Sequence, residues 1–139
     1  MISVHEKDTQ LLLQGLMGKD VHHVLDPTLL LSKDQWLETL EIKNKVNIKE
    51  KYILLYTVPK NPLIRNAVEY FSKKTGYKVV ALDQGLSAGA KVDKQIRDAG
   101  PIEFLELFSN AAFVITDSFH GTCFSINLEK PFITVSSGS

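Results

Sequence analysis

The sequence has little cysteine, no net charge and no long apolar run. Its single cysteine among 139 residues, Cys123, excludes an internal disulfide, so the reducing cytoplasm is the expected compartment. The 16 basic and 16 acidic residues balance, which gives no indication of nucleic acid or an anionic membrane as a partner. No apolar run reaches the roughly 18 residues of a transmembrane helix. We therefore expect a cytoplasmic globular protein without a transmembrane segment.

Nucleotide-binding and metal-binding patterns are also missing. The sequence contains neither G-x-G-x-x-G nor G-x-x-x-x-G-K-[ST], so it gives no support for an ordinary dinucleotide or nucleoside triphosphate site. His22 and His23 are adjacent on a short strand-like run and lack the spaced partners that a metal site needs. We expect no metal ion and no cofactor.

Strand-like and helix-like patterns alternate after residue 52. Strands are expected at 52–58, 77–82, 113–115 and 132–135, with helices at 63–75, after Pro101 and after Ser118. Residues 83–99 have no clear pattern and are expected to form a polar loop. The alternation predicts an α/β fold with a Rossmann-like parallel sheet and helices on both faces.

The first third of the chain is patterned less regularly. It predicts short strands at 2–4 and 21–25, and helices at 6–18 and 33–40. Residues 41–51 are polar and lysine-rich, which indicates a connection. The length suits one domain, 1–139. Because a strand-like run leads straight into the small polar tail, we expect the chain to be a fragment of a longer protein.

Residues 113–126 read as a strand, a tight turn and a helix. The apolar run 113–115 stops at turn and cap residues, and then Phe119, Cys123 and Ile126 recur at i, i+4 and i+7. This spacing predicts that these three side chains form the buried face of the helix. A helix start that follows a buried parallel strand presents backbone N–H groups and a positive dipole end, so it is a candidate anion site.

His120 is the main catalytic candidate in this stretch, as a general acid or an anion ligand; the alternative is local capping or packing. Asp117 and Ser118 are helix-capping residues first, and substrate ligands only if they face the ligand. Gly121 either permits close backbone approach or relieves crowding. Thr122 is a further candidate hydrogen-bond partner for an anion.

Two more candidates follow strands and so belong to the ligand edge. His5 comes after the first short strand, and Lys60 lies in the loop after the strand at 52–58; either could instead be an ordinary surface residue. Asp83 and Gly85 hold the matching position after the next strand and are further candidates of the same kind.

Three stretches carry a family resemblance. They are residues 2–7, residues 24–31 with Trp36, and residues 100–104 continuing to 116–122 and 130–133. Together they resemble the polysaccharide pyruvyl transferase family, in a subgroup with Asp-Ser-Phe-His-Gly at 117–121. The resemblance spans nearly the whole chain.

The resemblance implies a GT-B-like enzyme of two Rossmann-like halves, of which this chain is most of the C-terminal half. On this resemblance, we expect an N-terminal half that is missing from this sequence and holds much of the acceptor site. Such enzymes transfer a pyruvyl group from phosphoenolpyruvate to a glycan or lipid-linked sugar in surface polysaccharide biosynthesis. The motif histidine maps onto His120.

Two positions depart from the family pattern. Many members have arginine where His5 stands, and some have arginine in place of Ser118. Neither serine nor neutral histidine replaces the bidentate fork of arginine. The acceptor sugar, the donor geometry and the oligomeric state therefore stay open. The alternatives are half of a nucleotide-sugar glycosyltransferase and a non-catalytic ligand-binding remnant.

Overall fold

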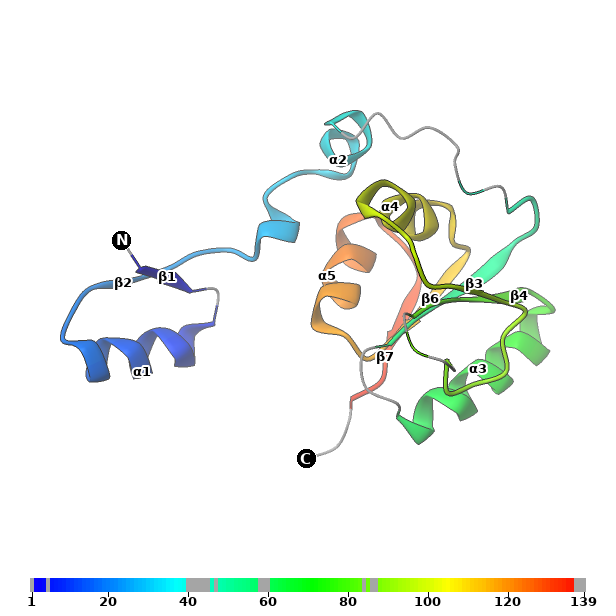
Figure 1. Cartoon of the computed structure of the whole chain (residues 1–139), viewed down its shortest axis with the longest axis horizontal. Helices are drawn as coiled ribbons and strands as arrows, with labels where there is room; N and C mark the ends of the chain where they lie inside the picture. The colour runs from blue at the N-terminus through cyan, green and yellow to red at the C-terminus, as the bar shows by residue number, and fades with distance from the viewer. Residues whose placement is uncertain are drawn as a thin grey trace. The chain divides into compact units, whose positions relative to one another are not determined.

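The computed structural model describes residues 2–4, 6–39, 46, 48–57, 61–83, 85 and 88–136. The chain divides into two compact units, residues 1–31 and residues 32–139 (Figure 1). Most of the polar connection expected at 41–51 lies outside the described residues.

The first unit is a β-α-β element. Strands β1 (Ile2–Val4) and β2 (Val21–His23) pair in parallel, and helix α1 (Lys7–Met17) connects them. Helix α1 ends at Gly18, whose φ of 60° is the left-handed conformation that glycine adopts most easily. After β2, the carboxylate of Asp26 accepts a hydrogen bond from the Thr28 N–H at 2.9 Å and starts the short 3-10 helix η1 (Pro27–Leu29). The predicted elements are confirmed, and β2 is shorter than expected.

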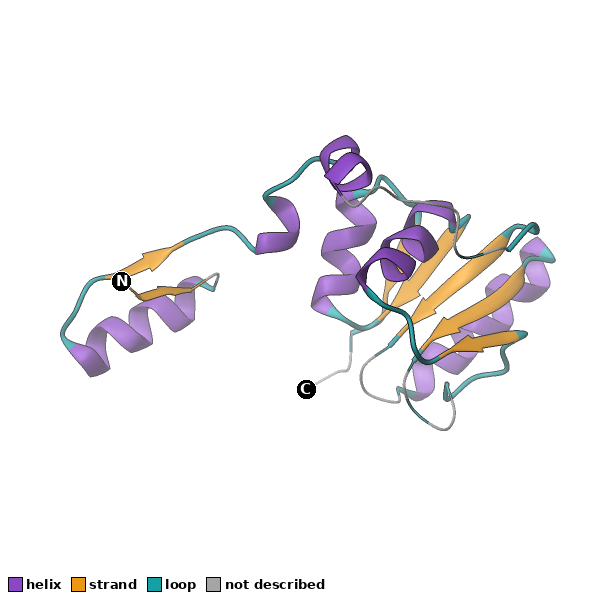
Figure 2. Cartoon of the chain, turned by 45° about the horizontal axis from the view of Figure 1, so that its top comes forward, coloured by secondary structure: helices purple, strands orange, loops and turns teal. Residues whose placement is uncertain are grey.

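The second unit is a five-stranded parallel sheet in the order β5-β4-β3-β6-β7. Its strands are β3 (Tyr52–Tyr56), β4 (Lys78–Leu82), β5 (Lys94–Ile96), β6 (Phe113–Thr116) and β7 (Phe132–Thr134). Its helices are α2 (Lys33–Thr39), α3 (Pro62–Thr75), α4 (Pro101–Asn110) and α5 (Phe119–Asn127). Helices cover both faces of this sheet (Figure 2), which confirms the Rossmann-like prediction.

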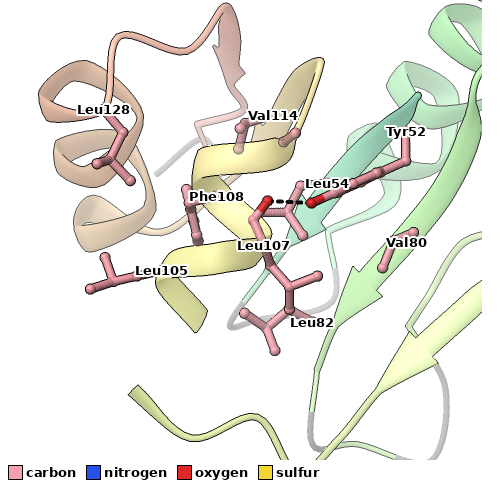
Figure 3. Close-up of a cluster of buried hydrophobic side chains, with 10 residues drawn as sticks. Tyr52, Leu54, Val80, Leu82, Leu105, Leu107, Phe108, Val114 and Leu128 are labelled. Atoms are coloured by element: carbon pink, nitrogen blue, oxygen red, sulfur yellow. Dashed lines mark hydrogen bonds between the residues drawn. The ribbon is translucent and has the colours of Figure 1, made fainter. Parts of the chain in front are cut away.

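Alternate residues of β3 supply two separate cores. Ile53 and Leu55 face helix α3, whereas Tyr52 and Leu54 face helix α4. The Tyr52 hydroxyl donates a hydrogen bond of 2.7 Å to the Leu107 carbonyl of α4 (Figure 3). This bond connects the central strand to the helix that covers it, and burial raises the pKa of Tyr52, with a smaller contribution from the nearby carboxyl of Glu106.

The prediction of a loop throughout residues 83–99 was wrong in one respect, because strand β5 lies within it. This strand is three residues long and begins with Lys94. It belongs to the sheet because its backbone pairs with β4, Val80 opposite Lys94 and Leu82 opposite Ile96. Backbone pairing of so short and polar a segment leaves no alternation of apolar and polar residues in the sequence, so the strand could not be predicted from it.

Helix α5 was predicted correctly, but its buried face was not. Cys123 is buried, whereas Phe119 is 56% exposed and Ile126 is 57% exposed. The buried face instead includes Gly121 and Ser125. The small residues on this face allow the helix to approach the sheet closely. Two of the three regularly spaced apolar side chains, Phe119 and Ile126, therefore face the solvent.

Candidate functional site

The strand order reverses between β3 and β6. From β3 the chain adds β4 and β5 on one side, and then β6 and β7 on the other. Helices α3 and α5, which follow β3 and β6 in the chain, pack against opposite faces of the sheet. In open parallel sheets, ligands bind at the carboxyl ends of the strands at such a switch point. In the paired register, Tyr56 of β3 lies opposite Thr116 of β6. The start of α5 follows directly at this switch point.

Side chains from the strand and the turn form the start of α5. Thr116 is fully buried, and its hydroxyl accepts a hydrogen bond from the Ser118 N–H at 3.1 Å. Ser118 is the N-cap, and its hydroxyl accepts a hydrogen bond from the Gly121 N–H at 3.3 Å. The Ser118 side chain thus caps the helix, which is one of the two roles that the sequence predicted for it.

Gly121 is where the helix touches the sheet. A Cβ atom at this position would overlap the Thr116 hydroxyl oxygen and come within 2.8 Å of Cδ1 of Tyr56. Both neighbours belong to strands, so neither is free to move far. Glycine is required here by packing, and this close contact fixes the height of the helix start above the carboxyl edge.

Thr122 joins α5 to the last strand. Its hydroxyl donates to the Ser118 carbonyl at 3.1 Å and shares a hydrogen bond of 2.7 Å with the Thr134 hydroxyl of β7. The pair is exposed. The Thr122 side chain is therefore directed toward β7, one strand away from the switch point.

His120 is exposed in the first turn of α5. Its ring meets that of Phe119 edge-on, with centroids 5.6 Å apart and an interplanar angle of 83°. Asp117 is half-buried in the turn between β6 and α5. The structure thus brings together Asp117, Ser118, His120, Gly121 and Thr122 around one helix start. The roles assigned to them stay predictions.

The other two predicted site residues, His5 and Lys60, lie outside the described residues. Thr57, which precedes the loop that contains Lys60, is described and lies at the carboxyl end of β3.

One cavity at this edge is lined by Asp83, a candidate from the sequence, together with residues that the sequence did not single out. It has a volume of about 400 Å³ and lies at the carboxyl ends of β3 and β4, where Tyr56, Thr57, Asp83, Arg97 and Phe104 line it. Arg97 is one of only two arginines in the chain. It was missed because it follows β5, the strand that the pattern did not reveal.

Within the described ranges, no three histidine, cysteine or acidic side chains are grouped as metal ligands. Over the same residues, no helix has the length and apolar character needed to cross a membrane.

The sheet order, the helices on both faces and the switch point define the second unit as a Rossmann-like α/β domain. The model of the polysaccharide pyruvyl transferase family matches residues 7–139, and the chain belongs to this family. No curated protein matches the sequence.

Solved structures of similar fold include UDP-GlcNAc 2-epimerases. UDP-GlcNAc 2-epimerase from Methanocaldococcus jannaschii superimposes with a TM-score of 0.62 at 20% identity, over 94% of this chain and 44% of that one. The same enzyme in complex with UDP-GlcNAc and UDP gives 0.58 at 19% identity, over 91% and 42%. The UDP-GlcNAc-bound enzyme from Neisseria meningitidis gives 0.50 at 16% identity, over 76% and 32%. The chain thus spans less than half the length of these relatives.

Proposed function

We propose that this chain is the donor-binding part of a pyruvyl transferase that moves the pyruvyl group of phosphoenolpyruvate onto a sugar in cytoplasmic steps of surface polysaccharide synthesis. One observation carries the proposal. In a member of the polysaccharide pyruvyl transferase family, the only histidine of the 117–122 segment stands exposed at a helix start, at the switch point of a parallel sheet.

The donor has two anionic groups, and the start of α5 suits one of them. The positive end of the α5 dipole favours an anion at this position. His120 in its protonated form adds a positive charge and a hydrogen-bond donor. The structural hydrogen bonds of Thr116 and Ser118 fix the turn, so the site requires little rearrangement when the donor binds.

The reaction requires a proton at carbon. One sugar hydroxyl forms a C–O bond to C2 of the enolpyruvyl unit while the methylene carbon accepts a proton and becomes methyl. A second hydroxyl then forms the other C–O bond to C2, and the C–O bond to phosphate breaks. One of the two hydroxyl protons restores the general acid that has given its proton to carbon. The other leaves with phosphate. His120 is the general acid that supplies the proton to carbon.

The complete enzyme needs more chain than this. The sequence covers 44% of the epimerase from M. jannaschii. In the first unit, α1 has no buried residue and leaves Leu11, Leu12 and Leu16 exposed. Apolar side chains grouped on one helix are normally covered. We infer that an N-terminal half-domain covers them and supplies much of the acceptor site.

A nucleotide sugar is the alternative ligand. Two of the similar structures are described as bound to UDP-GlcNAc, and the cavity beside Tyr56 adds space next to the helix start. In that reading the α5 start holds a diphosphate, and the chain is half of a nucleotide-sugar enzyme.

Calorimetric titration of phosphoenolpyruvate, and separately of UDP, into the chain tests the proposal. We expect phosphoenolpyruvate to bind and the His120→Ala variant to lose that binding. The His22→Ala variant is the control, because His22 is exposed on β2. Binding of UDP alone favours the nucleotide-sugar enzyme. If the chain and its full-length form both fail to bind either ligand, the non-catalytic remnant is the better reading.

A further inference from the structure

The cavity at the carboxyl edge is next to the proposed donor site but distinct from it. Tyr56 lies between the two. Tyr56 lines the cavity, and its Cδ1 atom is one of the sheet atoms that Gly121 of α5 approaches. Across the sheet, Tyr56 is opposite Leu82 of β4 on one side and Thr116 of β6 on the other. A molecule in the cavity would therefore lie one strand away from the start of α5.

The walls of the cavity suit a ring-shaped ligand. Tyr56 and Phe104 meet edge-on, with ring centroids 5.4 Å apart and an interplanar angle of 84°. The volume of about 400 Å³ is within the range of small-molecule sites and exceeds what a three-carbon donor needs. The C–H face of a pyranose packs favourably on aromatic and aliphatic walls, because this removes apolar surface from water.

The polar groups of the cavity have both signs. Asp83 is held in place, since its Oδ1 atom accepts a hydrogen bond of 2.8 Å from the Gly85 N–H. The Gln95 amide donates to the carbonyls of Asp83 at 3.2 Å and Gly85 at 2.8 Å, which fixes the same corner. Carboxylate and threonine oxygens are suitable partners for sugar hydroxyls, and Thr57 adds a hydroxyl on the same wall.

The opposite charges restrict the ligand class. A ligand with only anionic groups, such as phosphoenolpyruvate, would meet the Asp83 carboxylate. The guanidinium of Arg97 has a planar fork that matches carboxylate and phosphate, groups that a neutral sugar lacks. A hydroxyl-rich ring that also carries an anionic group suits both Asp83 and Arg97.

We propose that this cavity is an acceptor subsite for a sugar that bears a phosphate or a carboxylate, with Asp83 binding its hydroxyls and Arg97 binding its anionic group. The proposal rests on the pyruvyl transferase function proposed above. It places part of the acceptor site in this half of the enzyme, beside the donor.

Saturation-transfer NMR and titration with galactose, galactose 1-phosphate and galacturonate test the subsite. We expect the two anionic sugars to bind more tightly than galactose. Arg97→Gln should weaken binding of both by about tenfold or more, the effect of losing a hydrogen bond to a charged group, and leave galactose unchanged. Comparison of the two anionic sugars shows which group Arg97 prefers.

Two further variants sharpen the test. Asp83→Asn keeps an oxygen for the Gly85 N–H and should weaken binding of all three sugars. Arg65→Gln removes the other arginine, which is exposed on α3 and lines a different hollow with Lys73 and Lys91, and it should change nothing. Correct folding of each variant is checked by the fluorescence of the single tryptophan.

The donor site gives an independent readout. Arg97→Gln should bind phosphoenolpyruvate as the parent chain does, whereas His120→Ala should not. The subsite proposal is overturned if none of the three sugars binds, if Arg97→Gln binds anionic sugars normally, or if uridine binds in the cavity in place of the sugars. Loss of phosphoenolpyruvate binding in the Arg97→Gln variant would also overturn the subsite proposal, because it would assign the cavity to the donor.

Discussion

At the residue scale, a single helical turn combines a steric requirement with a chemical one. Gly121 has to be small because it contacts two strands, and His120 beside it is exposed. The contact of Gly121 with Thr116 and Tyr56 sets the position from which the His120 side chain extends. A change at Gly121 should therefore affect stability as well as the site.

Gly121→Ala should destabilise the second unit by about 1–3 kcal/mol, because the added methyl overlaps Thr116 and Tyr56. Urea unfolding followed by Trp36 fluorescence measures this, since Trp36 packs near Phe124 of α5 with ring centroids 5.9 Å apart. Gly15→Ala is the matched control. Gly15 lies within α1 and has open space around its Cα, so alanine should not destabilise the chain. Equal stability of Gly121→Ala and the parent would show that the close packing is not needed.

His120→Ala should reduce pyruvyl transfer in the full-length enzyme by about 10²–10⁴-fold, the usual contribution of a general acid. Release of phosphate from phosphoenolpyruvate in the presence of acceptor measures the rate. His23→Ala, at an exposed position on β2, serves as the control. A rate within a few-fold of the parent enzyme would remove His120 from the mechanism.

At the element scale, the sequence predicted those elements whose signals are local. The buried runs of β3, β4 and β6 and the stop at Gly76 after α3 could be read directly. Strand β5 could not, because it exists through pairing with β4. The face of α5 was misread, because close packing through Gly121 outweighed the spacing of Phe119 and Ile126. The cavity around Arg97 was missed for the same reason as β5.

The bond between Tyr52 and Leu107 gives a test at this scale. Tyr52→Phe should lower the free energy of unfolding by about 0.5–1.5 kcal/mol at neutral pH, because one buried hydrogen bond is lost. The folded state raises the pKa of Tyr52, so its stabilising contribution is complete below the pKa of the unfolded chain, about 10, and decreases as the pH rises above it.

Urea unfolding at pH 7 and at pH 10.5–11 measures both effects. The difference in stability between the parent and Tyr52→Phe should be smaller at the alkaline pH. A difference that stays constant or grows would contradict the raised pKa.

At the scale of the whole molecule, the two units differ in how completely they are packed. The second unit has two cores, one on each face of its sheet. The first has two strands of three residues and a helix with no buried residue. Together with the partial coverage of the similar enzymes, this supports the proposal of a further half-domain. The part of the proposed site that the chain itself would supply is the carboxyl edge of the second unit.

The location of the donor is the central claim, and chemical-shift mapping tests it most directly. The ¹⁵N-labelled chain is titrated with phosphoenolpyruvate, and the shifts of the backbone amides are followed. We predict that the largest changes occur at residues 117–122, with smaller ones at Thr57. Changes confined to the amino edge of the sheet near Lys78 and Lys94, or no change at millimolar donor, would contradict the account.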